Sequence, residues 1–279
     1  MDTVTRVFVV AMIVVALATY DQVPGWQWLL VSDALALTLV ELVKRAPRSS
    51  RFAGIAALWY PVLLIPAYYG QLGIIGVDVG HVRDLVVQQW EAALTGGQPS
   101  VAWHLAMPLP ALSWVLHACY AAHYVIFIGV PLWLWLRVGR DEGERAVFTI
   151  ALTFFVCYVG SALFPVAGPW YWFPRPTGPE SRVATARLVH WILDSGSSYG
   201  TAFPSSHVAA SWVAVLLAIR RAPALAAILA PVALGLAAGT VYGQFHYVVD
   251  ALAGAAVALT CFACGDWLRM RLARPASPP

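Results

Sequence analysis

The stretch Phe203-Pro204-Ser205-Ser206-His207 and its distant partner Gln244-Phe245-His246-Tyr247-Val248-Val249-Asp250 each lie where a long apolar run begins. His246 and Asp250 are four residues apart, so on a helix they share one face. His207 falls in the first turn of another helix, where free backbone N–H groups and the helix dipole favour an anion. Two histidines and a carboxylate beside an anion site predict phosphoryl chemistry through a phosphohistidine.

The composition is that of a protein with many membrane spans. The 279 residues are 60% hydrophobic and only 11% charged, and the mean hydropathy is +0.71. A soluble domain of this size needs more charged surface, so the composition predicts an all-α integral membrane protein. The chain has no basic run or aromatic-basic patch of the kind that tracks nucleic acid. The CxxC pair Cys261 and Cys264 lies inside an apolar run, which favours packing over a metal or redox role.

Eight apolar runs are long enough to be interpreted as membrane helices. We expect them at residues 4–20, 26–43, 53–75, 111–136, 146–164, 205–219, 223–241 and 245–268. We interpret the first run as a retained span, because it lacks a clear signal-peptide cleavage site and another apolar run follows soon after. The predicted organisation is two N-terminal membrane helices in residues 1–50, the remaining helices in 51–271 and a disordered tail in 272–279.

The distribution of basic residues gives the orientation, because cytoplasmic loops are enriched in Lys and Arg. Thirteen of the seventeen basic residues fall on one side of the eight-span map: Arg6, Lys44, Arg45, Arg48, Arg51, Arg137, Arg140, Arg145, Arg220, Arg221, Arg269, Arg271 and Arg274. The others fall on the opposite side: Arg83, Arg175, Arg182 and Arg187. We therefore expect a multi-pass protein of the cell membrane with both termini cytoplasmic and with His207 and His246 on the extracytoplasmic face.

Two segments outside the predicted spans have the mixed composition of interfacial helices. They are residues 77–95 and 180–194. Between them, Pro165 to Pro179 is rich in Pro, Gly, Trp and Tyr, which predicts a rigid aromatic lid at the level of the headgroups. Asp33 and Glu41 lie inside a predicted span without a partner motif, so we expect them to face the bundle or line a cavity.

A neutral histidine can attack phosphorus when another group orients its ring and stabilises the imidazolium that forms. His246 suits the nucleophile, and Asp250, one turn away, suits the group that accepts the proton on its far nitrogen. His207 suits the acid that protonates the leaving alkoxide and then activates the incoming hydroxyl. The N–H groups and hydroxyls of Ser205 and Ser206, with an arginine, suit the phosphoryl oxygens. The remaining histidines are interpreted as interface residues: His81, His104, His117, His123 and His190.

These motifs resemble those of the type 2 phosphatidic acid phosphatase superfamily. Phe203-Pro204-Ser205-Ser206-His207 is similar to its second signature, usually Pro-Ser-Gly-His, and His246-Tyr247-Val248-Val249-Asp250 to the His-x-x-x-Asp end of its third. Pro169 to Pro176 lies where the first signature belongs, so the resemblance covers residues 160–255. It implies a six-helix membrane core within residues 51–271 and a site without metal or cofactor that faces the extracytoplasmic side.

The resemblance is incomplete at the positions of the phosphate-binding cations. The common pattern has Lys, six residues and then Arg-Pro; Arg175-Pro176 is present, but Gly168 occupies the lysine position. The pattern also has Ser-Arg seven and six residues before the second histidine, where this chain has Gly239 and Thr240. Ser206 replaces the usual glycine of the second signature. Two of the three expected cations are therefore missing.

This depleted pattern, with Pro169-Trp170-Tyr171, is similar to the inositol phosphorylceramide synthase branch, in which a His-His-Asp triad does the work. A phosphodiester carries one negative charge and a phosphomonoester nearly two, so a site with fewer cations suits the diester. The resemblance therefore implies transfer of a phosphoinositol-like headgroup from a phospholipid to a lipid alcohol. A phosphatase acting on a phosphomonoester or a polyprenyl phosphate stays open, because Arg175 with Arg182 or Arg187 would rebuild the clamp.

The predicted site consists of the catalytic residues His246, His207 and Asp250 and a set of substrate-contacting residues. The latter are Arg175, Ser205, Ser206, Trp170, Tyr171, Thr240 and Tyr247. A transporter or flippase is a competing interpretation, because such proteins line a path with ionisable residues. It predicts charges near the bilayer midplane in both halves of the chain, whereas the catalytic residues cluster near one surface and in one half.

Overall fold

The computed structural model describes residues 1–46, 51–78 and 82–273. In this part of the chain the structure is helical, with one isolated parallel bridge between Val166 and Thr201. The longer helices are α1 (Asp2–Ala18), α2 (Trp26–Arg45), α3 (Arg51–Asp78), α6 (Pro110–Ala121), α7 (His123–Arg137), α8 (Arg140–Leu163), α11 (Ser206–Arg221), α12 (Pro223–Tyr242) and α13 (Val248–Ala273). The shorter ones are α4 (Asp84–Thr95), α5 (Pro99–Ala106), α9 (Pro169–Trp172), the 3₁₀ helix η1 (Pro179–Arg182) and α10 (Ala184–Gly196).

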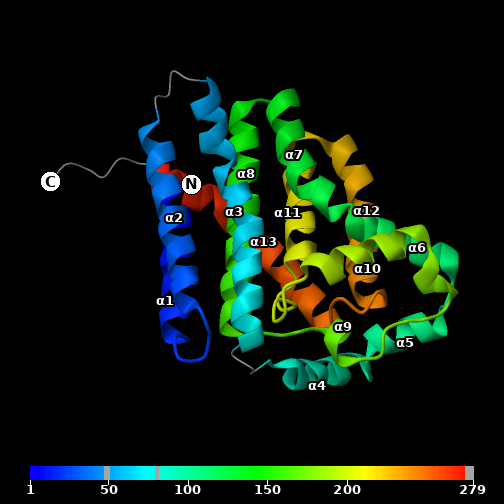
Figure 1. The fold of residues 1–279 in the computed structure, drawn as a ribbon. Coiled ribbons are helices and arrows are strands. Elements are labelled where there is room, and N and C mark those ends of the chain that lie inside the picture. Colours follow the sequence, from blue (N-terminus) through cyan, green and yellow to red (C-terminus); the bar gives the residue numbers. More distant parts are fainter. Residues whose placement is uncertain (47–50, 79–81, 274–279) are drawn as a thin grey trace.

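Helices α8 and α11 form the middle of the bundle. α8 packs against α1, α3, α7, α11 and α13, and α11 packs against α7, α8, α12 and α13. The buried face of α11 is rich in small residues, namely Ala209, Ala210, Ser211, Ala214 and Ala218. Small side chains let helix backbones approach closely, which drives helix packing in membranes. Figure 1 shows α8 between α3 and α7, with the α1–α2 hairpin on the outer side of α3.

The eight runs predicted to be membrane helices are all helical. The run predicted at 111–136 is two helices, α6 and α7, which meet at a bend of 45°. Among the described residues, five helices are long and apolar enough to cross a membrane, and the bent pair would make a sixth. α1 and α11 have only 17 and 16 residues. The predicted number of eight spans is therefore higher than length and composition support.

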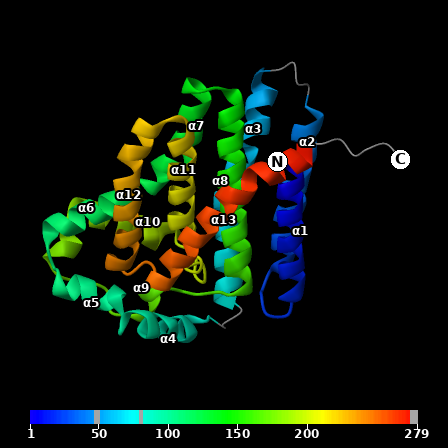
Figure 2. The same ribbon diagram turned by 180° about the vertical axis from the view of Figure 1, so that it is seen from behind.

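Ion pairs tie together one end of the bundle. Asp266 near the end of α13 pairs with Arg145 of α8 and with Arg220 of α11. Met1 lies at this same end, where it lines a surface hollow with Arg269. The start of α1 and the end of α13 are thus on one side of the bundle, away from α4, α5 and α9 (Figure 2). Which side of a membrane this end faces stays a prediction.

Short helices cover the opposite end of the bundle (Figure 1). The predicted interfacial segment 77–95 contains α4, and the segment 180–194 contains most of η1 and α10. Residues 79–81, with His81, lie outside the described residues, as do residues 274–279 of the predicted disordered tail. The sequence interpretation did not include α5, which begins with Pro99 at a position where proline is well tolerated.

Helix α4 has two distinct faces. It exposes Leu85 and Trp90, with 61% and 45% of their surface accessible, and it fully buries Asp84 and Glu91. Such an outward apolar face suits a helix that lies in the membrane interface. Its buried carboxylates point at the segments that carry the predicted site.

Candidate active site

The two sequence motifs meet where α11 and α13 begin. Ser205 is the N-cap residue of α11, and its hydroxyl accepts a hydrogen bond from the backbone N–H of Val208 at 3.4 Å. The backbone N–H of Ser205 donates to the carbonyl oxygen of Asp250 at 3.0 Å. Ser205 is fully buried. This serine therefore fixes the first turn of α11 and joins it to α13.

His246 is held by the turn between α12 and α13. The backbone N–H groups of Phe245 and His246 both donate to the carbonyl oxygen of Thr240, at 2.8 and 3.0 Å. The Nδ1 atom of His246 lies 2.9 Å from the carbonyl oxygen of Ala202. A carbonyl oxygen only accepts, so Nδ1 carries the proton and Nε2 keeps its lone pair. This is the tautomer that an attack through Nε2 requires.

Asp250 lies beside His246 but is not the nearest partner of its ring. The Oδ2 atom of Asp250 is 3.5 Å from Nδ1 of His246 and accepts a hydrogen bond from the backbone N–H of Tyr247 at 2.8 Å. Its Oδ1 atom has no hydrogen-bond partner among the described residues. The sequence predicted that Asp250 accepts the ring proton; the structure gives that position to the carbonyl of Ala202. Asp250 is placed to stabilise the positive charge of a reacting imidazole.

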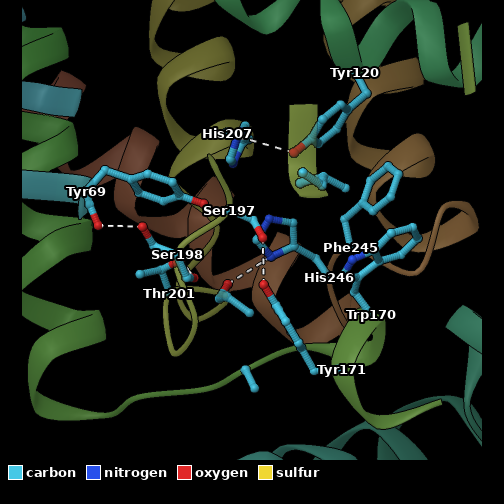
Figure 3. A pocket seen from close by; sticks show the side chains of 13 residues that line it. Tyr69, Tyr120, Trp170, Tyr171, Ser197, Ser198, Thr201, His207, Phe245 and His246 are labelled. Carbon is cyan, nitrogen blue, oxygen red and sulfur yellow. Dashed lines mark hydrogen bonds between the residues drawn. The ribbon is translucent and has the colours of Figure 1, made fainter. Parts of the chain in front are cut away.

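The two predicted catalytic histidines face one cavity of about 40 Å³. The centroids of the His207 and His246 rings are 5.8 Å apart. The Nε2 atom of His207 lies 3.3 Å from the hydroxyl oxygen of Tyr120, whose ring also stacks on the imidazole. Figure 3 shows both histidines at this cavity, with Tyr120 above His207 and Trp170 beside His246. The structure therefore brings the two distant motifs into one site.

Neutral hydroxyl groups dominate the polar lining of this cavity. They belong to Tyr69, Tyr120, Tyr171, Ser197, Ser198 and Thr201. The Tyr171 hydroxyl is 2.6 Å from that of Ser197, and the Ser198 hydroxyl donates to the carbonyl oxygen of Tyr69 at 2.6 Å. No lysine or arginine of the described chain is among the lining residues. From the described residues, the cavity can thus offer hydrogen bonds, but no lysine or arginine side chain, to a phosphoryl group.

Four of the ten predicted site residues line the cavity: His207, His246, Trp170 and Tyr171. Arg175 does not, because its guanidinium pairs with Asp194 at 2.9 Å and stacks 3.9 Å from the ring centroid of Trp170. Arg182 and Arg187 are exposed and also lie outside the lining. The cationic clamp that the sequence left open is therefore not assembled inside the cavity.

The other predicted residues act on the site through the backbone or from behind it. Ser205 and Asp250 join the two helix starts, as described above. Ser206 is buried and lines a neighbouring cavity. The hydroxyl of Thr240 donates to the carbonyl oxygen of Ala237 within α12, so its contribution to the site is the carbonyl that positions His246. These contacts position His246 and the starts of α11 and α13, and they do not reach the cavity.

A polar face of α4 holds the site from outside, and the sequence interpretation missed its role. Both carboxylate oxygens of Asp84 accept backbone N–H groups, from Ala167 and Gly168, at 2.8 Å each. The hydroxyl of Tyr247 donates to Asp84 at 3.1 Å and accepts from the side chain of Gln88 at 2.9 Å. Asp84 therefore links the loop before α9 to the turn that carries His246.

Glu91 extends the same face of α4 by two turns. Its Oε2 atom accepts a hydrogen bond from the backbone N–H of Val249 at 3.2 Å, in the first turn of α13. Burial raises the pKa of Glu91 to about 7, and burial likewise raises the pKa of Asp84. Acidic residues near Val86 and Val87 were visible in the sequence, but nothing in the sequence pattern paired them with residues eighty or more positions away.

Two glycines occupy positions where the family pattern has a lysine and a serine. Gly168 has a φ of +93°, and a Cβ atom there would lie 3.0 Å from the carbonyl oxygen of Phe245. Gly239 lies where α12 approaches α6, and a Cβ atom would lie 2.6 Å from the carbonyl oxygen of Leu116. A lysine or serine at these positions does not fit this backbone. The backbone around Gly168 and Gly239 is therefore packed too closely for the lysine and the serine of the family pattern.

His123 is a third histidine beside the site. It begins α7 at the bend with α6, and its ring centroid lies 4.5 Å from that of His207. Its Nδ1 atom is 3.4 Å from the hydroxyl of Ser211. The sequence predicted an interface residue, but His123 is buried inside the bundle. No signal in the sequence marks this position, because residues 111–136 read as one apolar run and the break at Ala122 comes from packing.

Among the described residues, no group of three or more His, Cys, Asp and Glu side chains could hold a metal ion. The site is instead built from two histidines, a buried aspartate and a ring of hydroxyl groups. With this geometry established, comparison with known proteins identifies the family.

The model of the PAP2 superfamily matches residues 86–264. The chain belongs to the PAP2 superfamily. A PA-phosphatase related-family protein of Dictyostelium discoideum is 27% identical over 244 residues, which is 74% of this chain. The chain spans about 44% of the length of that relative. No solved structure matches the chain. These similarities support an enzyme of the phosphatase or phosphotransferase type.

Proposed function

We propose that the protein is a metal-independent membrane phosphotransferase. It moves a phospho-headgroup, phosphoinositol-like in its chemistry, from a phospholipid to a lipid alcohol. The headgroup is carried in between as a phosphohistidine on His246. The site faces the extracytoplasmic side of the cell membrane, and the ion-paired end of the bundle faces the cytoplasm, in keeping with the distribution of basic residues.

The first half-reaction forms a P–N bond and breaks a P–O bond. Nε2 of His246 attacks the phosphorus of the donor, while Nδ1–H remains bonded to the Ala202 carbonyl. The departing lipid alkoxide takes a proton from His207, whose Nε2 lies within reach of the Tyr120 hydroxyl. The carboxylate of Asp250, 3.5 Å from Nδ1, stabilises the charge that the imidazole of His246 acquires.

The second half-reaction reverses these steps with a different alcohol. His207 removes the proton from the hydroxyl of the acceptor lipid. The acceptor oxygen attacks phosphorus, the P–N bond to His246 breaks, and the headgroup leaves on the new lipid. The same sequence with water as acceptor is hydrolysis, so the entry of water decides between transfer and hydrolysis.

One observation favours transfer of a diester over hydrolysis of a monoester: in the part of the chain that the structure describes, the polar lining of the cavity consists mainly of hydroxyl groups, without lysine or arginine. Hydroxyl groups suffice for the single charge of a phosphodiester, whereas a monoester with nearly two charges needs more compensation. No lysine or arginine of the described chain lines this cavity. Diester transfer therefore fits the site better.

A lipid phosphate phosphatase that hydrolyses a phosphomonoester or a polyprenyl phosphate is the second candidate. The printed name of the relative refers to PA-phosphatases. Arg175 supports this candidate too, because it stacks on Trp170 and Trp170 lines the cavity. Release of Arg175 from Asp194 would bring a cation towards the rim.

The test uses purified protein in detergent with EDTA throughout. A panel of labelled phospholipids that includes phosphatidylinositol is incubated with and without a lipid alcohol. The expected result is headgroup transfer by the wild type and none by His246→Ala. His104→Ala is the matched control, because His104 is a histidine of similar burial, 6% against 5% exposed, that does not line the cavity.

Three other outcomes would change the proposal. Release of inorganic phosphate from monoesters without transfer would establish the phosphatase. Transfer that appears only in a parallel assay without EDTA would refute the metal-free mechanism. Movement of lipid between leaflets in vesicles, with no bond broken in any substrate and no effect of His246→Ala, would indicate a transporter.

A further inference from the structure

A second cavity lies beside His207, within the bundle. Its volume is about 240 Å³, and its lining comes from α3, α7, α8, α10 and the start of α11. None of the described residues that line it is a Lys, Arg, Asp or Glu. An uncharged cavity among membrane helices is a suitable site for an apolar ligand.

This cavity adjoins the site that holds His207 and His246. Tyr69 and His207 line both cavities. Figure 3 shows these two residues on the same side of the first cavity, opposite Trp170. A molecule with a phosphate beside His207 can therefore extend from the first cavity into the second.

The lining of the second cavity changes from polar to apolar with depth. The three residues closest to the site on α3, α7 and α8 are Tyr69, His123 and Tyr158, all with a polar atom. One helical turn further from the site, the same helices present Ile65, Phe127 and Phe154. The order of these groups matches a lipid, whose polar headgroup is joined to a hydrocarbon chain.

The cavity lies between two helices that both pack on α8. α3 and α7 each contact α8, and both views of the fold show α8 between them (Figures 1 and 2). Residues on either side of the cavity reach the surface, because Pro66 of α3 is exposed and Tyr124 of α7 is 40% exposed. The side of the bundle between α3 and α7 is therefore where hydrocarbon from the bilayer can reach the cavity.

We propose that this cavity holds one hydrocarbon chain of the lipid substrate, which enters sideways from the bilayer between α3 and α7. This inference rests on the proposed function, because it needs a lipid substrate at His207. It also predicts selectivity for the length of the lipid's hydrocarbon chain. The rings of Phe127 and Phe154, with centroids 5.4 Å apart, set how far that hydrocarbon chain can extend. The chain length that the enzyme prefers is then a property of these two rings.

The activity test changes the deep end of the cavity and leaves the site intact. Phe127→Trp fills space that a chain would occupy, and Phe127→Ala enlarges it. Val125→Trp is the matched control, because Val125 lies on the same helix and is 71% exposed on its outer face. The substrates share one headgroup and differ in chain length, a six-carbon diacyl lipid against a long-chain lipid.

The expected readout is the ratio of kcat/KM for the long-chain and the short-chain substrate. Each methylene excluded from an apolar site lowers binding about fourfold, so Phe127→Trp lowers this ratio by about tenfold and Val125→Trp by less than about twofold. Phe127→Ala shifts the preference towards longer chains. An unchanged ratio in Phe127→Trp and Phe127→Ala, both still active on the short-chain lipid, would overturn the proposal.

A labelling experiment separates this proposal from the proposed function. A phospholipid with a diazirine in the middle of one chain is photolysed with the wild-type protein, and labelled residues are mapped by mass spectrometry. Adducts on α7 near Phe127 or on α8 near Phe154, removed by excess unlabelled lipid, are the expected result. Adducts confined to outward residues such as Val125 would refute the chain site, even in an active enzyme. If adducts form in the cavity but no lipid is turned over, the chain site would stand and the proposed phosphotransferase function would be refuted.

Discussion

Replacing Asp84 by asparagine tests how α4 holds the active site. Asp84 is fully buried, and its two carboxylate oxygens accept the N–H groups of Ala167 and Gly168 at 2.8 Å each. Asparagine has nearly the same size but presents one oxygen and one NH₂ group, so one backbone donor is left facing another donor. An unsatisfied buried donor costs about 1–3 kcal/mol. We expect Asp84→Asn to lower the unfolding temperature in detergent by about 5 °C.

The same substitution has a catalytic consequence that a surface change lacks. Ala167 lines the cavity, and the Tyr247 hydroxyl that Asp84 holds belongs to the residue after His246. A shift of about 1 Å in a catalytic group lowers the rate by up to about a hundredfold. We expect kcat to fall between about tenfold and a hundredfold.

The control for Asp84→Asn is Asp141→Asn at the other end of the bundle. Asp141 is exposed and pairs with Arg269 on the surface, an interaction worth less than about 1 kcal/mol. The assay measures thermal unfolding and steady-state kinetics of the three proteins in the same detergent. A wild-type kcat in Asp84→Asn, at any stability, would refute the idea that this carboxylate positions the site.

The site allows four further predictions. The pKa of Glu91 is raised from 4.5 to about 7, so the folded protein loses stability as the pH rises through this range. Glu91→Gln should remove this loss, and thermal unfolding at several pH values measures the change. Tyr120→Phe removes the hydroxyl beside His207 but keeps the ring, and should lower kcat about threefold to tenfold in steady-state assays. Gly168→Lys restores the cation of the family pattern at a φ of +93°, and should destabilise the protein by at least about 1 kcal/mol without raising phosphatase activity. Arg175→Ala should change kcat/KM for a diester by less than about threefold, because the side chain lies outside the cavity.

The sequence was sufficient to predict the helical bundle and the pairing of its two motifs. Apolar runs of about twenty residues specify membrane helices by composition alone. His207 and His246 carry enough local context, a Pro-Ser turn and an aspartate four residues on, to be recognised as partners without a structure. The prediction that both motifs meet in one site agrees with the 5.8 Å between their rings.

The contacts made through the backbone could not be predicted from the sequence. The carbonyl oxygen of Ala202 accepts a hydrogen bond from Nδ1–H of His246, and every residue type carries such a carbonyl. Thr240 was predicted from its position in a signature, but its carbonyl and not its hydroxyl serves the site. Arg175 was predicted from a conserved-looking Arg-Pro pair, whereas Asp194, nineteen residues on, determines where its guanidinium lies.

Long-range polar contacts were the other part that the sequence did not reveal. Asp84 meets Tyr247 across 163 positions of the chain. A pattern of one helix shows which residues share a face, but not which distant segment that face contacts. The bend between α6 and α7 was missed for the same reason, because the run reads as one apolar segment and only packing places His123 against His207.

Helices α11 and α13 are joined by polar contacts at both ends, which limits how the site between them can widen. Near the site, Ser205 bonds to Asp250; at the far end, Asp266 bridges to Arg220. These contacts hold the starts of α11 and α13, and with them the rings of His207 and His246, around a cavity of about 40 Å³. Room for a headgroup therefore has to come from the loops that line the cavity. One of them, the segment between α10 and α11, is tied to Val166 by a backbone bridge and to His246 through the carbonyl oxygen of Ala202. If a lining loop moves more slowly than the chemical steps, its movement would limit turnover in place of P–N bond formation.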